Sequence, residues 1–230
     1  LILTEPSQSV KLDSMNIEQT TLEARAARHA ALADVARLAV VDALSIGDKA
    51  PGELQTMLGL NSNLMAHHLK VLEAAGITSR RRSEGDRRRT YLTLADRSVI
   101  EPATTQLHAD RVLFVCTANS ARSQLAAAMW AQSSSIPVAS AGTKPAPRIA
   151  PGARAAAKRH HLSLLDSVPQ NVAAVAKPRD LVVAVCDNAY EDLGDLIDVH
   201  WSIPDPVAAA KSAGGTRAFD AAFDELSRRV

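Results

Sequence analysis

A cysteine, an arginine and a serine in the segment VCTANSARSQL are the residues of this chain best placed to do chemistry. Cys116 ends an apolar run, Arg122 follows six positions later, and Ser123 lies at the start of a helix-forming stretch. A thiolate can attack an electrophilic phosphorus or arsenic centre. A guanidinium is a planar fork that matches two oxygens of a tetrahedral oxyanion. The spacing therefore predicts a nucleophile and an anion ligand at the two ends of one short loop.

The loop between Cys116 and Ser123 is expected to hold its anion with backbone groups. It follows a strand-like run and precedes a helical stretch, so successive N–H groups can converge at a helix N-terminus. The same field stabilises a thiolate, Ser123 can donate its hydroxyl to the sulfur, and Asn119 can pin the loop. The alternative is an inert, buried cysteine at a strand end. The expected oxyanion-binding residues are Thr117, Ala118, Asn119, Ser120, Ala121 and Ser123.

This loop resembles the phosphate-binding loop of low-molecular-weight tyrosine phosphatases and of the arsenate reductases that share their fold. The resemblance rests on Cys116-x₅-Arg122-Ser123 directly after a strand. It implies that Asp205, in the later segment HWSIPDPV, is the general acid that protonates the leaving oxygen while Cys116 attacks. Pro206 would stiffen the loop that carries this acid, although Asp-Pro also occurs as a plain turn.

Two features favour the arsenate reductases over the phosphatases. Val207 stands where the phosphatases typically carry an aromatic residue, and the segments SAGTKPAPRIAPGA and VCDNA resemble the reductases. The resemblance makes Cys186 the second thiol, which attacks the cysteine–arsenate adduct; the alternative is a core cysteine. The third cysteine of that family is missing, so an external reductant, a low-molecular-weight thiol or a thioredoxin-like protein, would be required. A tyrosine phosphatase, and a regulator that only senses an oxyanion, stay open as alternatives.

The residues from 111 onward alternate between short β-branched runs and helical stretches. The runs VLFV and LVVAV predict strands, and the stretches 122–132, 151–161, 189–196 and 216–229 predict helices. Such alternation is typical of a parallel sheet with helices on both faces. We therefore predict a three-layer α/β domain over residues 109–230, as the resemblance to the low-molecular-weight phosphatases also implies.

The N-terminal half predicts a winged helix-turn-helix, mostly helical with one β-hairpin. Residues 19–46 have apolar positions at helical spacing, and Pro51 and Gly59 suit the start and the end of a short helix. Asn61 or Ser62 can cap the helix that follows. The stretch ITSRRRSEGDRRRTYLTL then alternates around an acidic turn, as a β-hairpin does.

Residues 30–94 resemble the ArsR family of winged-helix repressors, and HLKVLEAAGI matches the end of its recognition helix particularly well. The resemblance implies a homodimer that binds double-stranded DNA, with the helix in the major groove and the basic hairpin on phosphates. A solvated basic hairpin is the alternative. The cysteine pair with which many members sense arsenite or metals is absent from DKAPGELQTML. The expected DNA-binding residues are Ser62, Asn63, Ala66, His67, Lys70, Arg81, Arg87, Arg88 and Arg89.

Composition bounds the remaining possibilities. The hydrophobic content of 47% is enough for two cores, and no apolar run approaches the ~20 residues of a membrane span. Two cysteines cannot build a disulfide framework and, without a secretory signal, they predict reduced thiols in a cytoplasmic protein. No metal site is expected, because the adjacent His67 and His68 point to different helix faces.

We place the domain boundary near residue 108. Residues 15–108 are predicted to form the DNA-binding domain, and residues 95–110 to form a last helix and the connector to the next domain. Met15 is a candidate natural start, which would make residues 1–14 a tail or a cloning remnant.

Overall fold

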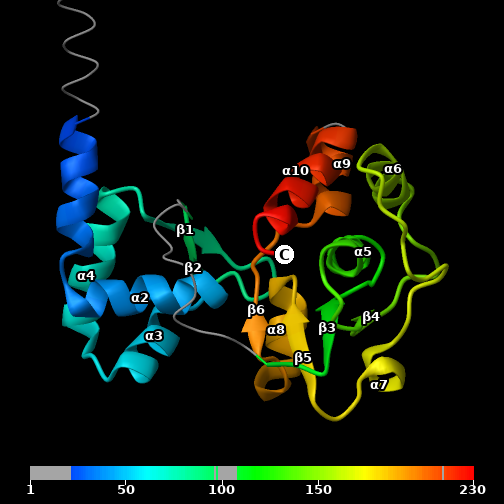
Figure 1. The fold of residues 1–230 in the computed structure, drawn as a ribbon, viewed down its shortest axis with the longest axis horizontal. Coiled ribbons are helices and arrows are strands. Elements are labelled where there is room, and N and C mark those ends of the chain that lie inside the picture. Colours follow the sequence, from blue (N-terminus) through cyan, green and yellow to red (C-terminus); the bar gives the residue numbers. More distant parts are fainter. Residues whose placement is uncertain (1–21, 96, 98–107, 214) are drawn as a thin grey trace, which may run out of the picture.

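The computed structural model describes residues 22–95, 97, 108–213 and 215–230, which form two domains side by side (Figure 1). Within this part of the chain, no helix is both long enough and apolar enough to cross a membrane. The predicted tail at residues 1–14 lies outside the described residues, as does most of the helix and connector predicted over 95–110.

The N-terminal domain is a winged helix-turn-helix, in which helices are followed by a two-stranded antiparallel hairpin. Its elements are α2 (Val35–Ile46), α3 (Pro51–Leu58), α4 (Ser62–Ala74), β1 (Thr78–Arg82) and β2 (Thr90–Leu94). Pro51 opens α3, and Gly59 follows it in the left-handed conformation with φ 64°, as predicted. Asn61 caps α4 by accepting a hydrogen bond from the Leu64 N–H at 2.9 Å.

The helical stretch predicted over residues 19–46 is interrupted in the structure. A helix covers residues 22–32, and α2 begins only at Val35. Asp34 lies between them with an extended backbone and accepts a hydrogen bond from the Arg37 N–H at 3.0 Å. An aspartate competes for backbone N–H groups and so favours a cap over a helix interior. This local preference overrides the continuous apolar spacing.

The C-terminal domain is built on a parallel sheet, as predicted. Its elements are β3 (Arg111–Cys116), α5 (Arg122–Ser133), β4 (Val138–Gly142), α6 (Pro151–Arg159), α7 (Val172–Val175), β5 (Asp180–Ala184), α8 (Asp187–Leu193), the 3₁₀ turn η2 (Gly194–Leu196), β6 (Val199–His200), α9 (Pro206–Ala213) and α10 (Thr216–Ser227). The strand order is β4-β3-β5-β6, and all neighbours are parallel. β3 is buried from Val112 to Cys116, as expected of a central strand covered on both faces.

The predicted strands and helices of this domain all occur, but several further elements do not follow from the sequence pattern. β4 has the sequence VASAG, in which small residues replace the β-branched run that predicts a strand, and β6 has only two residues. The short helices α7 and α9 were likewise not predicted. The stretch predicted as helix over 189–196 is α8 followed by η2.

The two domains contact each other through buried polar groups. The Trp201 Nε1–H donates to the Ile46 carbonyl at 3.0 Å. Asp48, two residues after the end of α2, accepts from the Ser202 N–H at 2.7 Å and from Arg229 Nη1 at 3.0 Å. The Asp48 and Arg229 side chains are 1% and 2% exposed. A buried ion pair of this kind is costly to break, so the contact holds the domains in a defined relation.

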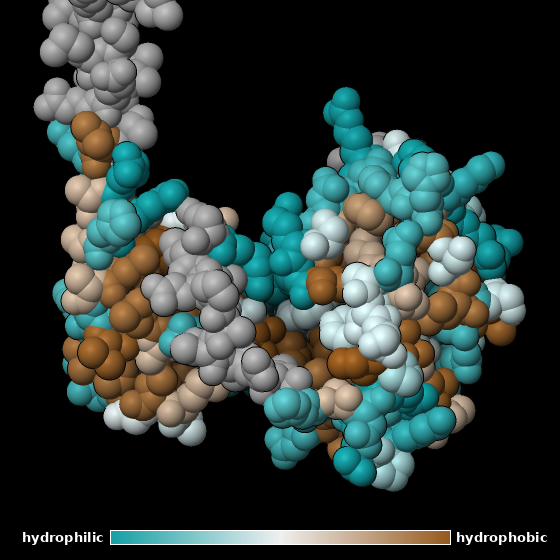
Figure 2. Space-filling view, viewed as in Figure 1, coloured by the Kyte–Doolittle hydropathy of each residue, from teal (hydrophilic) through white to brown (hydrophobic). Residues whose placement is uncertain are grey.

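Apolar side chains lie on the visible surface of the N-terminal domain, whereas the visible face of the C-terminal domain is more polar (Figure 2). Val35, Leu38, Met57 and Leu64 are among the large apolar residues exposed on the N-terminal domain, by 40% to 85%. Exposed apolar groups of this kind mark a candidate association surface.

Candidate active site

Cys116 ends β3 and Arg122 begins α5, so the predicted loop connects a strand to a helix. The Cys116 sulfur lies 3.1 Å from the Ser123 Oγ and accepts a hydrogen bond from the Asn119 N–H at 3.2 Å. The loop therefore fixes the position of the Cys116 sulfur, the candidate nucleophile, through two hydrogen-bonding partners.

The carbonyl groups of this loop are turned away from its centre. Four of them accept a hydrogen bond from the segment after β4, at 2.8 to 3.1 Å. The N–H groups of Thr143, Lys144, Ala146 and Ala150 donate, in that order, to the carbonyl groups of Cys116, Thr117, Ala118 and Ser120. Within the described residues, the N–H groups of Ala118, Ser120 and Ala121 have no protein acceptor. Backbone donors of this arrangement can bind an oxyanion.

Asn119 holds the loop in shape from beneath. It is fully buried and has a left-handed backbone with φ 47°, which asparagine tolerates better than most residues. Its amide nitrogen donates to the Ser123 Oγ at 2.8 Å and to the Ser140 Oγ at 2.9 Å. Its amide oxygen accepts from Gln124 Nε2 at 3.1 Å and from the Gln170 N–H at 2.8 Å. Asn119 and Ser123 thus support the anion site from behind it.

Gly142, at the end of β4, is a part of the site that the sequence analysis missed. A Cβ atom at this position would lie 2.6 Å from the Thr117 carbonyl oxygen and 2.9 Å from the Asn119 nitrogen. Both are backbone atoms of the loop, so only glycine allows this approach. The segment SAGTKPAPRIAPGA carried the signal as a resemblance, but no role could be assigned to its residues without the packing.

Arg122, the first residue of α5, is 6% exposed. Its Nη1 donates to the Ile203 carbonyl at 2.8 Å and to Glu84 Oε2 at 3.1 Å, and its Nη2 lies 3.7 Å from Asp205 Oδ1. Burial disfavours the charged form, but the two cysteine sulfurs and the two carboxylates outweigh it and raise the pKa of Arg122 above its usual value. Arg122 is therefore a permanent cation beside the sulfur.

The loop lines a pocket of about 310 Å³. Asp205, the predicted general acid, lies on this pocket directly before α9 and is half-buried. Its Oδ1 accepts a hydrogen bond from the Val207 N–H at 2.9 Å. The lining contains no aromatic side chain among the described residues, and consists of Cys116, Thr117, Ala118, Ser120, Ala121, Arg122, Ala146, Asn188, Asp205 and Val207.

Cys186, the predicted second thiol, lies behind the same loop. It is fully buried and caps α8, where its sulfur accepts from the Ala189 N–H at 3.4 Å. The Thr117 Oγ1 is 3.5 Å from this sulfur. Burial and the charge of Cys116 raise the pKa of the Cys186 thiol, and Arg122 opposes them. Through the Thr117 hydroxyl, Cys186 thus contacts the loop that carries Cys116.

The predicted DNA-binding residues fall into two groups. Those of α4 lie together on its exposed face: Ser62, Asn63, Ala66, His67 and Lys70. On the hairpin, Arg87 and Arg89 are exposed, and the exposed Arg88 pairs with Asp86 at 3.0 Å. Arg81 is different, because its Nη1 donates to the Ser202 carbonyl of the C-terminal domain. Among the described residues, no group of His, Cys, Asp and Glu side chains could hold a metal ion.

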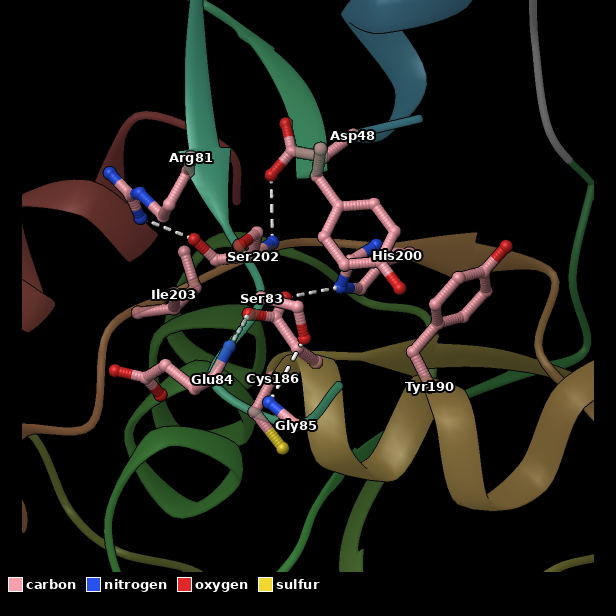
Figure 3. Close-up of polar contacts among 12 residues, drawn as sticks. Asp48, Arg81, Ser83, Glu84, Gly85, Cys186, Tyr190, His200, Ser202 and Ile203 are labelled. Carbon is pink, nitrogen blue, oxygen red and sulfur yellow. Dashed lines mark hydrogen bonds and ion pairs between the residues drawn. The ribbon is translucent and has the colours of Figure 1, made fainter. Parts of the chain in front are cut away.

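The acidic turn of the hairpin reaches the site from the other domain (Figure 3). Glu84 lies beside the pocket and bonds to Arg122, and the Arg81 and Ser83 side chains also contact the C-terminal domain. Sequence reasoning identified Glu84 only as a turn residue. The one available signal was a carboxylate in the middle of the arginine-rich run RRRSEGDRRR.

Comparison with known families gives a match over the C-terminal domain. Residues 111–230 match the family described as low molecular weight phosphotyrosine protein phosphatase. The matched residues include the whole parallel sheet, the loop and Asp205. A search of curated proteins found no match.

Each of three similar solved structures matches one half of the chain: two resemble the C-terminal domain and one resembles the N-terminal domain. An arsenate reductase from Archaeoglobus fulgidus is 29% identical, with 51% of this chain and 96% of that chain covered and a TM-score of 0.42. The tyrosine phosphatase amsI from Erwinia amylovora is 21% identical, with 55% and 95% covered and a TM-score of 0.44. The homodimeric winged helix-turn-helix domain of a possible ArsR-family regulator from Mycobacterium bovis is 24% identical, with 43% and 80% covered and a TM-score of 0.32.

Proposed function

This chain belongs, through residues 111–230, to the low molecular weight phosphotyrosine protein phosphatase family, and from that premise we propose that it is a thiol-dependent arsenate reductase. The observation that carries the proposal is the second thiol. Cys186 lies behind the nucleophile's loop, with its sulfur 3.5 Å from the Thr117 hydroxyl. Dephosphorylation needs one thiol, whereas reducing arsenate needs two electrons, which two thiols supply when they form a disulfide.

In the first step, arsenate binds between the free N–H groups of the loop and the Arg122 guanidinium. The Cys116 thiolate forms a bond to arsenic, and one arsenic–oxygen bond breaks. Asp205, on the same pocket, gives its proton to the departing oxygen, which leaves as water. The product of this step is a cysteine–arsenate adduct at the end of β3.

In the second step, the Cys186 sulfur attacks the Cys116 sulfur, and the sulfur–arsenic bond breaks. Its electron pair stays on arsenic, which leaves as arsenite and takes up the Cys186 proton, while a Cys116–Cys186 disulfide remains. Cys116 and Cys186 are the two cysteines of the chain, so no third internal thiol can receive this disulfide. An external low-molecular-weight thiol or a thioredoxin-like protein must reduce it.

The pocket suits a small inorganic oxyanion. Val207 and three alanines, Ala118, Ala121 and Ala146, contribute its apolar lining, and no described aromatic residue is there to stack on a phenyl ring. Turnover of phenyl phosphate without any thiol would favour the phosphatase alternative. Oxyanion binding without any multiple turnover would favour a domain that only senses its ligand.

We expect arsenate turnover to depend on Cys186 and on an added thiol. Without reductant, the wild-type protein should stop after about one turnover, and mass spectrometry should find a Cys116–Cys186 disulfide. Cys186→Ser should accumulate the arsenic adduct, or release arsenite only when a small thiol attacks Cys116 directly. A core role for Cys186 predicts instead a loss of stability with normal thiol-driven turnover, and that result would contradict the two-thiol mechanism.

The N-terminal domain is proposed to bind double-stranded DNA as a homodimeric repressor in the same arsenic response. The exposed face of α4, with Asn63, His67 and Lys70, supports this role, since it is free to enter a major groove. The exposed apolar residues of this domain offer a surface for a second copy.

We expect DNA binding to weaken steeply with salt, because arginines displace counterions from phosphates. Replacing Arg87, Arg88 and Arg89 with alanine should reduce the slope of log K against log salt by about 0.9 for each phosphate that the hairpin no longer neutralises. Arg179→Ala, an exposed arginine of the C-terminal domain, is the control and should leave the slope unchanged. An unaltered slope in the triple variant would show that the hairpin does not hold phosphates. Binding titrations at several salt concentrations would decide.

A further inference from the structure

The tip of the β1–β2 hairpin, residues 83–86, is fixed against the C-terminal domain by hydrogen bonds (Figure 3). The Glu84 N–H donates to Asp187 Oδ2 at 2.9 Å. Glu191 on α8 accepts from the Ser83 hydroxyl at 2.7 Å and from the Asp86 N–H at 2.6 Å. These bonds use backbone groups as well as side chains, so they hold the tip in one register beside the oxyanion pocket.

The acceptor for the Glu84 N–H is itself held rigidly. Asp187 is 2% exposed, and its Oδ1 bonds to His200 Nε2 at 3.0 Å. The His200 ring stacks on Tyr190, with ring centres 4.2 Å apart, and packs edge-on against Tyr91 of β2. Tyr91 belongs to the N-terminal domain, so both domains contribute to the surface that the tip of the hairpin contacts.

Gly85 can lie against this surface because it has no side chain. A Cβ atom there would lie 2.2 Å from Glu191 Oε2 and 3.1 Å from Asn188 Oδ1. Gly85 is not among the residues with positive φ, so the turn itself can accept another residue. The glycine therefore matches the contact between the domains rather than the hairpin alone.

The Glu84 side chain joins two functional parts of the pocket. Its carboxylate accepts from Arg122 Nη1 at 3.1 Å and from the Asp205 N–H at 2.9 and 3.1 Å. Arg122 is the anion-binding cation and Asp205 the general acid of the proposed reaction. One carboxylate from the N-terminal domain thus links both groups.

The hydrogen bond with Glu84 determines which nitrogens of Arg122 remain available to bind an oxyanion. The two hydrogens of Nη1 are directed to the Ile203 carbonyl and to Glu84. Nε and Nη2 make no hydrogen bond within the described residues, although Nη2 lies 3.7 Å from Asp205 Oδ1, and this pair forms one side of the guanidinium fork. A tetrahedral oxyanion requires such a pair of parallel donors. Tying down Nη1 therefore orients the fork for the substrate.

We propose that Glu84, a residue of the N-terminal domain, is a positioning residue of the oxyanion pocket in the C-terminal domain. The inference rests on the proposed reduction of arsenate for its substrate, but the geometric role concerns any tetrahedral oxyanion. Glu84 touches neither the sulfur nor the pocket floor, and it acts through Arg122 and the peptide of Asp205. Without it, the guanidinium and the acid loop would each lose a fixed partner.

The test compares Glu84→Ala and Glu84→Gln with Asp86→Asn in the full chain. Asp86 is the matched control, because it lies on the same tip but its carboxylate bonds to Arg88 and not to the pocket. We expect Glu84→Ala to lower kcat/KM for thiol-driven arsenate reduction by about 10- to 100-fold, the loss expected when a binding group shifts by about 1 Å. Glu84→Gln keeps a carbonyl acceptor and should recover part of the loss, and Asp86→Asn should match the wild type.

A second measurement does not depend on turnover. Inorganic phosphate should protect Cys116 from alkylation by iodoacetamide. The extent of alkylation is measured by mass spectrometry of the Cys116 peptide. Glu84→Ala should raise the phosphate concentration for half-protection about 10-fold or more, with Asp86→Asn unchanged. Equal or stronger protection in Glu84→Ala would mean that Glu84 is a bystander or competes with the oxyanion for Arg122, and would overturn the proposal. If no variant reduces arsenate, the proposed function fails, while the protection assay still decides the role of Glu84.

Discussion

Cys116→Ser is expected to abolish arsenate reduction and any phosphatase activity. A serine hydroxyl is a much weaker nucleophile than the cysteine sulfur that contacts the Asn119 N–H and the Ser123 hydroxyl, so the nucleophile is lost. Removal of a catalytic nucleophile lowers kcat by a factor on the order of 10⁶. Multiple-turnover assays with an added thiol, and with phenyl phosphate in its absence, would measure the effect.

The same variant should leave DNA affinity close to that of the wild type. Cys116 lies at the end of β3 in the core of the C-terminal domain, whereas the exposed face of α4 belongs to the other domain. Unchanged DNA binding would show that the N-terminal domain is intact, and a circular dichroism spectrum equal to that of the wild type would show that the C-terminal domain is folded, which isolates the chemical loss. Residual turnover near the wild-type rate would rule out Cys116 as the nucleophile.

Arg122→Lys is expected to be nearly as damaging, although it keeps the charge. A lysine ammonium is a point charge and cannot present two parallel donors to an oxyanion. The variant would also release the Ile203 carbonyl and Glu84, which both bond to Nη1. Loss of a preorganised anion donor costs about 10²- to 10³-fold in kcat. We expect a loss of at least this size in kcat/KM, together with weaker protection of Cys116 by phosphate.

Arg154→Lys provides the matched control for this substitution. Arg154 is an exposed arginine on α6 whose Nη2 donates to the Ser167 carbonyl at 2.8 Å, away from the pocket. Its replacement should leave kcat/KM unchanged. A threefold or smaller loss in Arg122→Lys would show that charge alone is sufficient at position 122, and the role of the planar fork would then be rejected.

The local parts of the site could be predicted from the sequence because their partners are close in the chain. Cys116, Asn119, Arg122 and Ser123 lie on one strand-loop-helix unit, whose geometry follows from the residue types and their order. The same holds for the cap at Asn61. Where a local signal competed with a longer pattern, as at Asp34, the sequence analysis gave too much weight to the apolar spacing over residues 19–46.

Only the tertiary structure decided how distant segments meet at the pocket. Glu84 reaches Arg122 across 38 residues and Asp205 across 121, and Arg81 bonds to Ser202 instead of lying free on the hairpin. Periodicity reports which face of an element is buried, but not which element of another domain covers it. That choice depends on how the surfaces of two domains fit together, here around a buried ion pair of Asp48 with Arg229. The local geometry of the loop was therefore readable in the sequence, whereas its connection to the hairpin arises from packing between the domains.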